Sequence, residues 1–338
     1  MNPKIILVTG SAPPDPCGIG DYTASLADSL ENAGQQVEVF CHRDWSLTGT
    51  SKALLNLVAA RKALVHMQYP SLGYGYSLGP QLCLLARQGI VTIHEFSLAH
   101  PLRKLSLFPF TLRSPCIVMP SQFERDALVQ RMPWAKSRVR VIPIGSNIYP
   151  HAAPQMDREQ SVIYFGLLTP RKGLEDFLEF SRQVRANNLN WNLLAIGRIF
   201  PGQEAYAQSL IASLAAYKVQ LILDRSADEV SDLLSKAGLA YLPFPDGASE
   251  RRGSLKAALA AGVPCITTSS AQTPLELAQS VVLAASPFEA VEVARRLMAS
   301  ETERFRLSQQ ATEYARQFSW ETIAALHINM YRELGGAS

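Results

Sequence analysis

The sequence predicts an α/β protein made of two Rossmann-like domains, each a parallel sheet covered by helices, with a cleft between them. Its 338 residues are too many for one ordinary core and suit two domains. Short apolar segments typical of buried strands alternate with helical segments along the whole chain. After a polar, proline-containing linker at His151–Gln160, the same strand–loop–helix order begins again.

In the first half, a buried strand is followed by a long loop at residues 10–21 and then by a helix at Tyr22–Asn32, with Gly34 placed to end it. Ser121 and Glu124 have the spacing of a capping box at the start of another helix. The expected strands are Ile5–Val8, Val37–Cys41, Leu64–Gln68, Val91–His94, Cys116–Met119 and Arg140–Pro143.

In the second half, a strand leads through a loop at residues 166–173 into a helix at Leu174–Asn187. Ser226 and Glu229 form a second capping-box pattern, at the start of a helix that reaches Lys236. The expected strands are Val162–Phe165, Leu193–Ile196, Gln220–Leu223, Leu239–Phe244 and Pro264–Thr268.

Composition narrows the class of protein. Hydrophobic residues make up 47% and charged residues 18%, which is typical of soluble globular proteins. The net charge of +3 comes from 32 basic and 29 acidic residues spread along the chain, so we expect no nucleic-acid partner. Five widely spaced cysteines favour buried thiols in a reducing compartment. The N-terminal segment is interpreted as a first strand, not a signal peptide, and we expect a cytoplasmic protein.

The stretch at residues 241–268 combines a strand end, a carboxylate, guanidinium groups and a helix start. An apolar strand runs into a Pro-Asp-Gly-Ser loop, then into Glu250, Arg251, Arg252 and Gly253, and then into an alanine-rich helix. In α/β sheets, ligands bind where strands end and helices begin, and helix N-termini favour anions. The stretch therefore predicts a site for a phosphorylated small molecule, although a plainly capped helix start is the alternative.

Three other loops carry candidate residues. Gly18 and Gly20 in the first loop let the backbone approach a ligand closely, unless they belong to a plain glycine loop. Arg171 and Lys172 precede a helix and are placed to neutralise a pyrophosphate, unless they form a solvated basic turn. His94 directly follows a buried strand at the edge of the presumed cleft, or is a satisfied core histidine.

His66 has a similar place on the preceding strand, and there we favour the core interpretation.

The ordered set of segments resembles glycosyltransferase family 4. The segments are GIGDYTASLADSLENAGQQVEVF, VTIHEF, PSQFERDAL, VRVIPIGSN, VIYFGLLTPRKGLEDF and residues 241–268, with FSWETIAALHINMY near the end. The resemblance implies a GT-B fold with domains at residues 1–150 and 151–319 and a C-terminal helix, about 320–338, that crosses back to the first domain.

The same resemblance implies a retaining sugar transfer from a nucleotide-diphosphate sugar, with no metal and no cofactor. It implies a glycan or lipid-linked acceptor in polysaccharide or glycoconjugate assembly. The implied catalytic residues are His94, Lys172 and Glu250, and the implied donor-binding residues are Gly18, Gly20, Arg171, Ser249, Arg251, Arg252, Gly253 and Ser254.

The chain departs from two motifs of the family pattern. The family usually has an arginine where Leu167 stands. It usually has two glutamates eight positions apart, where this chain has Ser249 and Ala257, with Glu250 beside the first position. These departures keep open a catalytically inert sugar or nucleotide binder. A non-hydrolysing sugar-nucleotide epimerase is a further alternative, whereas a nicotinamide dehydrogenase is disfavoured because the GxGxxG fingerprint is missing.

The segment Pro101–Pro115 interleaves three cations with leucines and phenylalanines. One interpretation is a helix or loop packed on the first domain. The other is peripheral contact with an anionic membrane surface, at the inner membrane face, because many enzymes of the family use lipid-linked acceptors.

Overall fold

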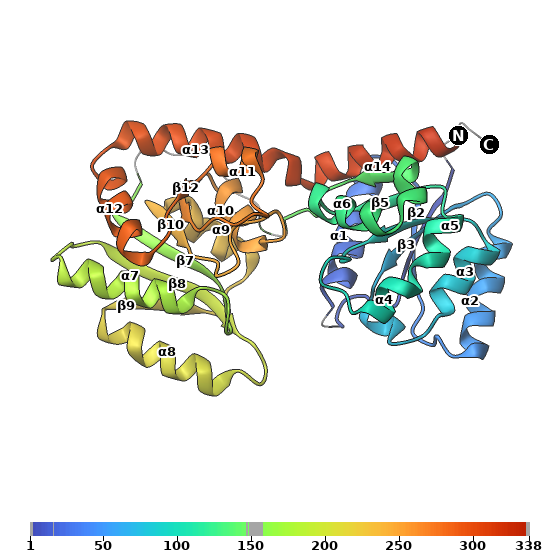
Figure 1. The fold of residues 1–338 in the computed structure, drawn as a ribbon, viewed down its shortest axis with the longest axis horizontal. Coiled ribbons are helices and arrows are strands. Elements are labelled where there is room, and N and C mark those ends of the chain that lie inside the picture. Colours follow the sequence, from blue (N-terminus) through green and yellow to red (C-terminus); the bar gives the residue numbers. More distant parts are fainter. Residues whose placement is uncertain (1–2, 16, 147, 149–157, 336–338) are drawn as a thin grey trace. The chain divides into compact units, whose positions relative to one another are not determined.

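The computed structural model describes residues 3–15, 17–146, 148 and 158–335. The chain forms two compact units, which we describe separately (Figure 1). Unit 1 consists of Met1–Gly145 with Phe318–Ser338, and unit 2 is Ser146–Gln317. Residues 151–157 of the predicted linker lie outside the described residues. The predicted cleft between the domains stays a prediction.

Unit 1 is built on a six-stranded sheet in the order β2-β1-β3-β4-β5-β6, and every pairing in it is parallel. The central strands are apolar and buried because helices cover both faces. The strands are β1 Ile5–Thr9, β2 Val37–Cys41, β3 Leu64–Tyr69, β4 Ile90–Ile93, β5 Ile117–Met119 and β6 Val139–Val141.

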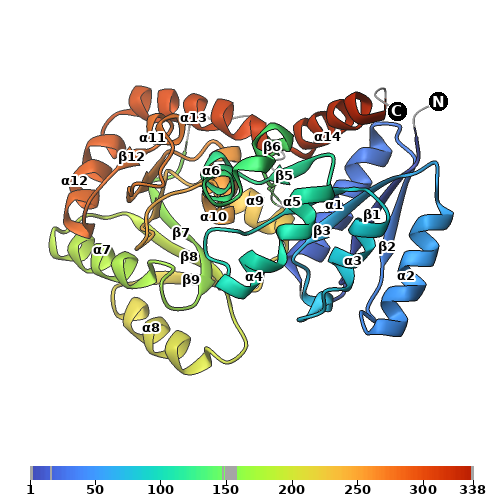
Figure 2. The same cartoon turned by 45° about the vertical axis from the view of Figure 1, so that its right-hand side comes forward.

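The helices of unit 1 fall into two packed groups. Helices α1 and α14 contact each other, while α2, α3 and α5 pack together (Figure 2). The final helix of the chain belongs to unit 1. The helices are α1 Gly18–Asn32, α2 Leu47–Ala59, α3 Gly79–Ala86, α4 Pro101–Ser106, α5 Phe108–Arg113, α6 Gln122–Arg131 and α14 Trp320–Gly335, with 3-10 turns at Leu72–Tyr74 and Pro133–Arg138.

Unit 2 has its own core and a second parallel six-stranded sheet, in the order β12-β11-β10-β7-β8-β9. Both units are therefore α/β sheets of Rossmann-like plan, and the predicted fold class is confirmed. The strands are β7 Ser161–Leu168, β8 Asn192–Ile199, β9 Val219–Leu223, β10 Leu239–Leu242, β11 Cys265–Thr267 and β12 Val282–Leu283.

The helices of unit 2 cover its sheet with amphipathic faces. In the helix that follows β7, Leu174, Phe177 and Val184 are buried at helical spacing. The helices are α7 Leu174–Ala186, α8 Glu204–Ala216, α9 Ala227–Lys236, α10 Gly253–Ala260, α11 Leu275–Gln279, α12 Pro287–Met298 and α13 Glu301–Ala315, followed by a 3-10 turn at Arg316–Phe318.

Two predicted loop boundaries are wrong. Helix α1 begins at Gly18 and not at Tyr22, so both candidate glycines of the first loop lie in the first helical turn. A Cβ on Gly20 would lie 2.8 Å from the carbonyl oxygen of Ser11, so glycine permits the helix to approach this segment closely. Strand β7 continues through Leu168, because parallel pairing with β8 extends to its end.

Of the two predicted capping boxes, that of Ser226 and Glu229 is confirmed in full. Ser121 also caps its helix by accepting a hydrogen bond from the backbone N–H of Glu124. The buried carboxylate of Glu124 also accepts hydrogen bonds from the backbone N–H groups of Phe96 and Ser97 at 2.8 Å. It thereby fixes the loop that follows β4.

Candidate functional site

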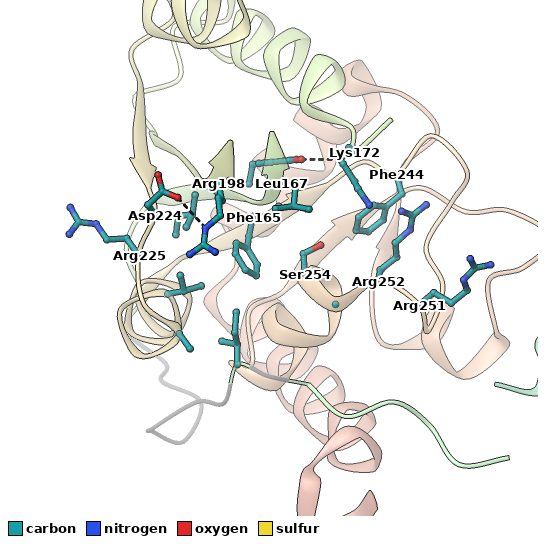
Figure 3. Close-up of a pocket in the computed structure, with 18 residues that line it drawn as sticks. Phe165, Leu167, Lys172, Arg198, Asp224, Arg225, Phe244, Arg251, Arg252 and Ser254 are labelled. Carbon is teal, nitrogen blue, oxygen red and sulfur yellow. Dashed lines mark hydrogen bonds and ion pairs between the residues drawn. The ribbon is translucent and has the colours of Figure 1, made fainter. Parts of the chain in front are cut away.

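Unit 2 contains a cavity of about 450 Å³ at the carboxyl ends of its central strands (Figure 3). Its lining comes mainly from the ends of β7 and β8, the loops after β7, β9 and β10, and the starts of α9 and α10. This is the edge at which open α/β sheets bind ligands, and the volume is in the range of small-molecule sites. The lining residues are Ile148, Tyr164, Phe165, Gly166, Leu167, Lys172, Ile196, Gly197, Arg198, Asp224, Arg225, Ala227, Val230, Phe244, Arg251, Arg252, Gly253 and Ser254.

Lys172 lines the cavity from the turn that joins β7 to α7. The Tyr164 hydroxyl, which lies on the strand before the turn, donates a hydrogen bond of 3.1 Å to the Lys172 carbonyl oxygen. Gly173 has a φ of 85°, and a Cβ there would lie 1.7 Å from the carbonyl oxygen of Pro243. Only glycine fits this turn, so the position of Lys172 is set by its neighbours on both sides.

Arg171, by contrast, is exposed and is not among the residues that line the cavity, although it too has a positive φ, of 66°.

Arg252 and the N-terminus of α10 form the second cationic element of the cavity. The Arg252 guanidinium lies 4.6 Å from the centroid of the Phe244 ring and pairs with Asp246. Ser254 and Gly253 line the cavity in the first turn of the helix, where backbone N–H groups have no intrahelical partner.

Lys172 and Arg252 influence each other electrostatically. Desolvation lowers the pKa of Lys172, and the charge of Arg252 lowers it further. Desolvation also lowers the pKa of Arg252. Two partly desolvated cations beside a helix N-terminus form a site for an anion. Arg251 also lines the cavity, but its side chain is exposed.

Glu250 and Ser249 are not among the lining residues. The Tyr314 hydroxyl donates to Oε1 of Glu250 at 3.4 Å, and desolvation raises the pKa of the Glu250 carboxyl. The charge of Lys256, a residue of α10 that is only 5% exposed, acts in the opposite direction. In this structure Glu250 therefore belongs to a polar cluster shared with α13, whereas the carbonyl oxygen of Ser249 accepts from the N–H of Arg252 at 3.0 Å.

His94 lies in unit 1, directly after β4. Its Nε2 is 3.0 Å from Oε1 of Gln68, and the ring of Tyr22 packs edge-on at 4.7 Å. Desolvation lowers the pKa of His94 to about 3, so the imidazole is neutral at pH 7. In the tautomer that carries the proton on Nε2, this nitrogen donates to the amide oxygen and Nδ1 is an acceptor.

His66 is fully buried and its two ring nitrogens contact the hydroxyls of Tyr331 and Thr92, each at 2.7 Å, which confirms the core interpretation.

The sequence profile of the family described as glycosyl transferases group 1 matches residues 150–318, half of the chain. The chain belongs to this family. The match covers the whole described cavity except Ile148. No curated protein sequence matches the chain.

Solved glycosyltransferases share the fold over the full length of this family member. HepE of Anabaena, in complex with UDP and glucose, aligns with a TM-score of 0.71 at 16% identity, over 98% of this chain and 100% of that one. AviGT4, involved in avilamycin A biosynthesis, gives 0.63 at 19% identity over 99% of both chains. WaaG, involved in lipopolysaccharide biosynthesis, gives 0.63 at 15% identity over 97% and 99%. These likenesses establish the GT-B fold of this glycosyl transferase.

The two departures from the family pattern have different structural settings. Leu167 lies at the cavity wall with 39% of its surface exposed, so the position of the usual arginine is occupied by an apolar side chain. Ala257 is 1% exposed and packs in the core of unit 2, away from the cavity lining.

Sequence reasoning missed Arg198, Asp224 and Phe244 as cavity residues. Each follows or ends a strand that was predicted correctly in outline, at the carboxyl edge of the sheet. Their position at the ends of predicted strands could therefore have identified them as cavity residues, whereas their side-chain contacts could not be predicted from the sequence.

The stretch Pro101–Pro115 forms α4 and α5. Its buried side chains fit a segment packed on the first domain, and its exposed side chains fit a segment that contacts a membrane surface. Leu107 and Phe110 are buried in unit 1. Leu102, Leu105 and Phe108 are 71%, 69% and 43% exposed beside the cationic side chains of the same helices. Within the described part of the chain, no helix is both long and apolar enough to span a bilayer.

Proposed function

We propose that this glycosyl transferase moves a sugar from a nucleoside-diphosphate sugar to a glycan or lipid-linked acceptor, with retention of anomeric configuration. The observation that carries the proposal is the pair of partly desolvated cations, Lys172 and Arg252, beside the N-terminus of α10. A diphosphate leaving group gains negative charge as the glycosidic bond breaks, and fixed cations and N–H groups stabilise that charge. The structural likeness to HepE, which was solved with UDP and glucose, supports this donor class.

The remaining predicted residues receive roles on this basis. Ser254, Gly253 and Arg251 line the cavity and would contact the donor. Neutral His94 would accept a hydrogen bond at Nδ1 from a hydroxyl of the sugar, in a reaction that we propose needs no metal. The predicted contact of Glu250 with the donor sugar stays a hypothesis, since its carboxylate contacts Tyr314 and Glu250 is not a lining residue of the cavity.

For the acceptor side, we propose polysaccharide or glycoconjugate assembly at the inner membrane face. The exposed leucines and the cations of α4 and α5 support peripheral contact with an anionic lipid surface. Co-sedimentation with anionic vesicles tests this contact. Leu102→Asp with Leu105→Asp should abolish it, while Leu47→Asp, an exposed leucine of α2, should not.

The function itself is tested by incubating the protein with UDP-, GDP- and ADP-sugars and candidate acceptors. Acceptor-dependent release of nucleoside diphosphate, with an α-linked product from an α-linked donor, supports a retaining transferase. Binding without release favours the inert binder suggested by Leu167 and Ala257, and an epimerised donor favours an epimerase. If Lys172→Ala leaves transfer unchanged, the site assignment is wrong whatever the class.

A further inference from the structure

The cavity of unit 2 has a second charged end, opposite Lys172 and Arg252 (Figure 3). There Nε of Arg198, on β8, donates to Oδ1 of Asp224 at 3.1 Å. Within the described part of the chain, the terminal nitrogens of Arg198 and Oδ2 of Asp224 have no other polar partner. Figure 3 shows Arg225, which pairs with Glu229, pointing away from this end.

Stability does not explain the pair. The two side chains are 65% and 63% exposed, and exposed ion pairs contribute little to the free energy of unfolding. Asp224 nevertheless has a φ of 54°, in the left-handed region, and its N–H donates to the carbonyl oxygen of Gly197 at 3.0 Å. A non-glycine residue held in this conformation at a ligand cavity is a candidate functional position.

The surroundings of the pair are apolar. Ile148, Ala227 and Val230 line the cavity, the last two from the start of α9, and Phe165 lies on the strand next to Arg198. A cavity end with apolar walls and one charged pair fits a flat ring that has apolar faces and a polar edge. A nucleobase is such a ring, and this end of the cavity lies opposite the cations that we propose hold the diphosphate (Figure 3).

We propose that Arg198 and Asp224 select guanine as the base of the donor, an inference that rests on the proposed function of the same cavity. Guanine carries two adjacent donors, N1–H and N2–H, which match the two oxygens of a carboxylate. It also carries two adjacent acceptors, O6 and N7, which match two N–H groups of a guanidinium. Adenine lacks the paired donors, and uracil offers a single N–H to the carboxylate.

The test measures binding of GDP, UDP, ADP and xanthosine diphosphate by calorimetry, without any sugar or acceptor. The wild-type protein should bind GDP about 10- to 100-fold more tightly than UDP or ADP. Asp224→Asn should weaken GDP by a similar factor and make xanthosine diphosphate the preferred ligand, since the amide can donate to the added carbonyl group. Glu179→Gln, which breaks an exposed ion pair with Arg182 on α7, is the matched control and should leave the order unchanged.

The outcomes separate the two claims. If UDP or ADP binds more tightly than GDP, or if Asp224→Asn weakens all the diphosphates equally, the guanine inference is overturned and the transferase proposal stands. If no nucleoside diphosphate binds at all, the proposed function fails together with the inference. A preference for GDP that moves to xanthosine diphosphate in the variant supports both.

Discussion

Lys172→Met should lower ligand affinity without lowering the stability of the ligand-free protein. The lysine lies in a half-buried position beside Arg252, and desolvation and the neighbouring charge both lower its pKa. A lysine whose pKa is lower in the folded than in the unfolded state destabilises the fold at any pH below its unfolded pKa, and pH 7 is below it. Methionine has nearly the same length and no charge. We therefore expect the free energy of unfolding of the ligand-free protein to stay the same or rise.

The effect on binding follows from the contact that is lost. A charge-assisted hydrogen bond to a ligand phosphate is worth about 1.5–3 kcal/mol, which corresponds to about 10- to 150-fold in affinity. Because Lys172 and Arg252 would share one diphosphate, their variants should not be additive, and the double variant should lose less than the product of the two factors.

Calorimetric titration with nucleoside diphosphates and urea denaturation at pH 7 measure the two quantities on the same samples. Lys62→Met, in an exposed position of unit 1, is the control and should change neither. The reasoning is refuted if Lys172→Met leaves diphosphate affinity within twofold of wild type. It is equally refuted if the variant is clearly less stable, since the lysine would then be a structural group.

Gly173→Ala should destabilise unit 2 by about 2 kcal/mol or more, because of the positive φ and the contact with Pro243, as urea denaturation would reveal. Glu250→Gln should cost about 1–3 kcal/mol, since buried Lys256 loses a charge partner; an unchanged midpoint would contradict this. Burial lowers the pKa values of three histidines of unit 1, that of His327 to about 4. The free energy of unfolding is therefore at its full value above the unfolded pKa of about 6.5, and it decreases as the pH falls below that value. Melting temperatures from pH 7.5 to 5 should decline, and less steeply in His327→Leu.

The fold was predictable because its signals are local and repeated. Buried parallel strands such as Ile5–Thr9 are continuous apolar runs, and the alternation with helices leaves few topologies. The start of α1 was missed because glycines and prolines precede it and its cap residue, Cys17, makes no side-chain capping bond. The close approach of Gly20 to Ser11 accompanies this helix start, and no pattern in the sequence indicates that approach.

The sequence predicted where candidate residues lie relative to the strands better than it predicted which residues their side chains contact. Lys172 and Arg252 flank strand ends, and the structure places both at one cavity. The sequence placed Glu250 beside them, since it precedes the same helix. Its carboxylate instead contacts Tyr314, which is more than sixty positions further along the chain and packs on α10 through α13. Contacts made across such a separation depend on packing that no local pattern records.

The loss of the usual family arginine need not remove positive charge from the site. Leu167 leaves the end of β7 apolar, but the guanidinium of Arg252 lies on the Phe244 ring at the same cavity, close enough to lower the pKa of Lys172. A cation of this cavity therefore lies at the N-cap of α10. Since Arg252 is also held by Asp246, it is preorganised for an anion, and preorganised charge is what a departing diphosphate requires. The same substitution leaves an apolar wall between the two charged ends of the cavity, as a nucleotide with a charged diphosphate and a flat base would need.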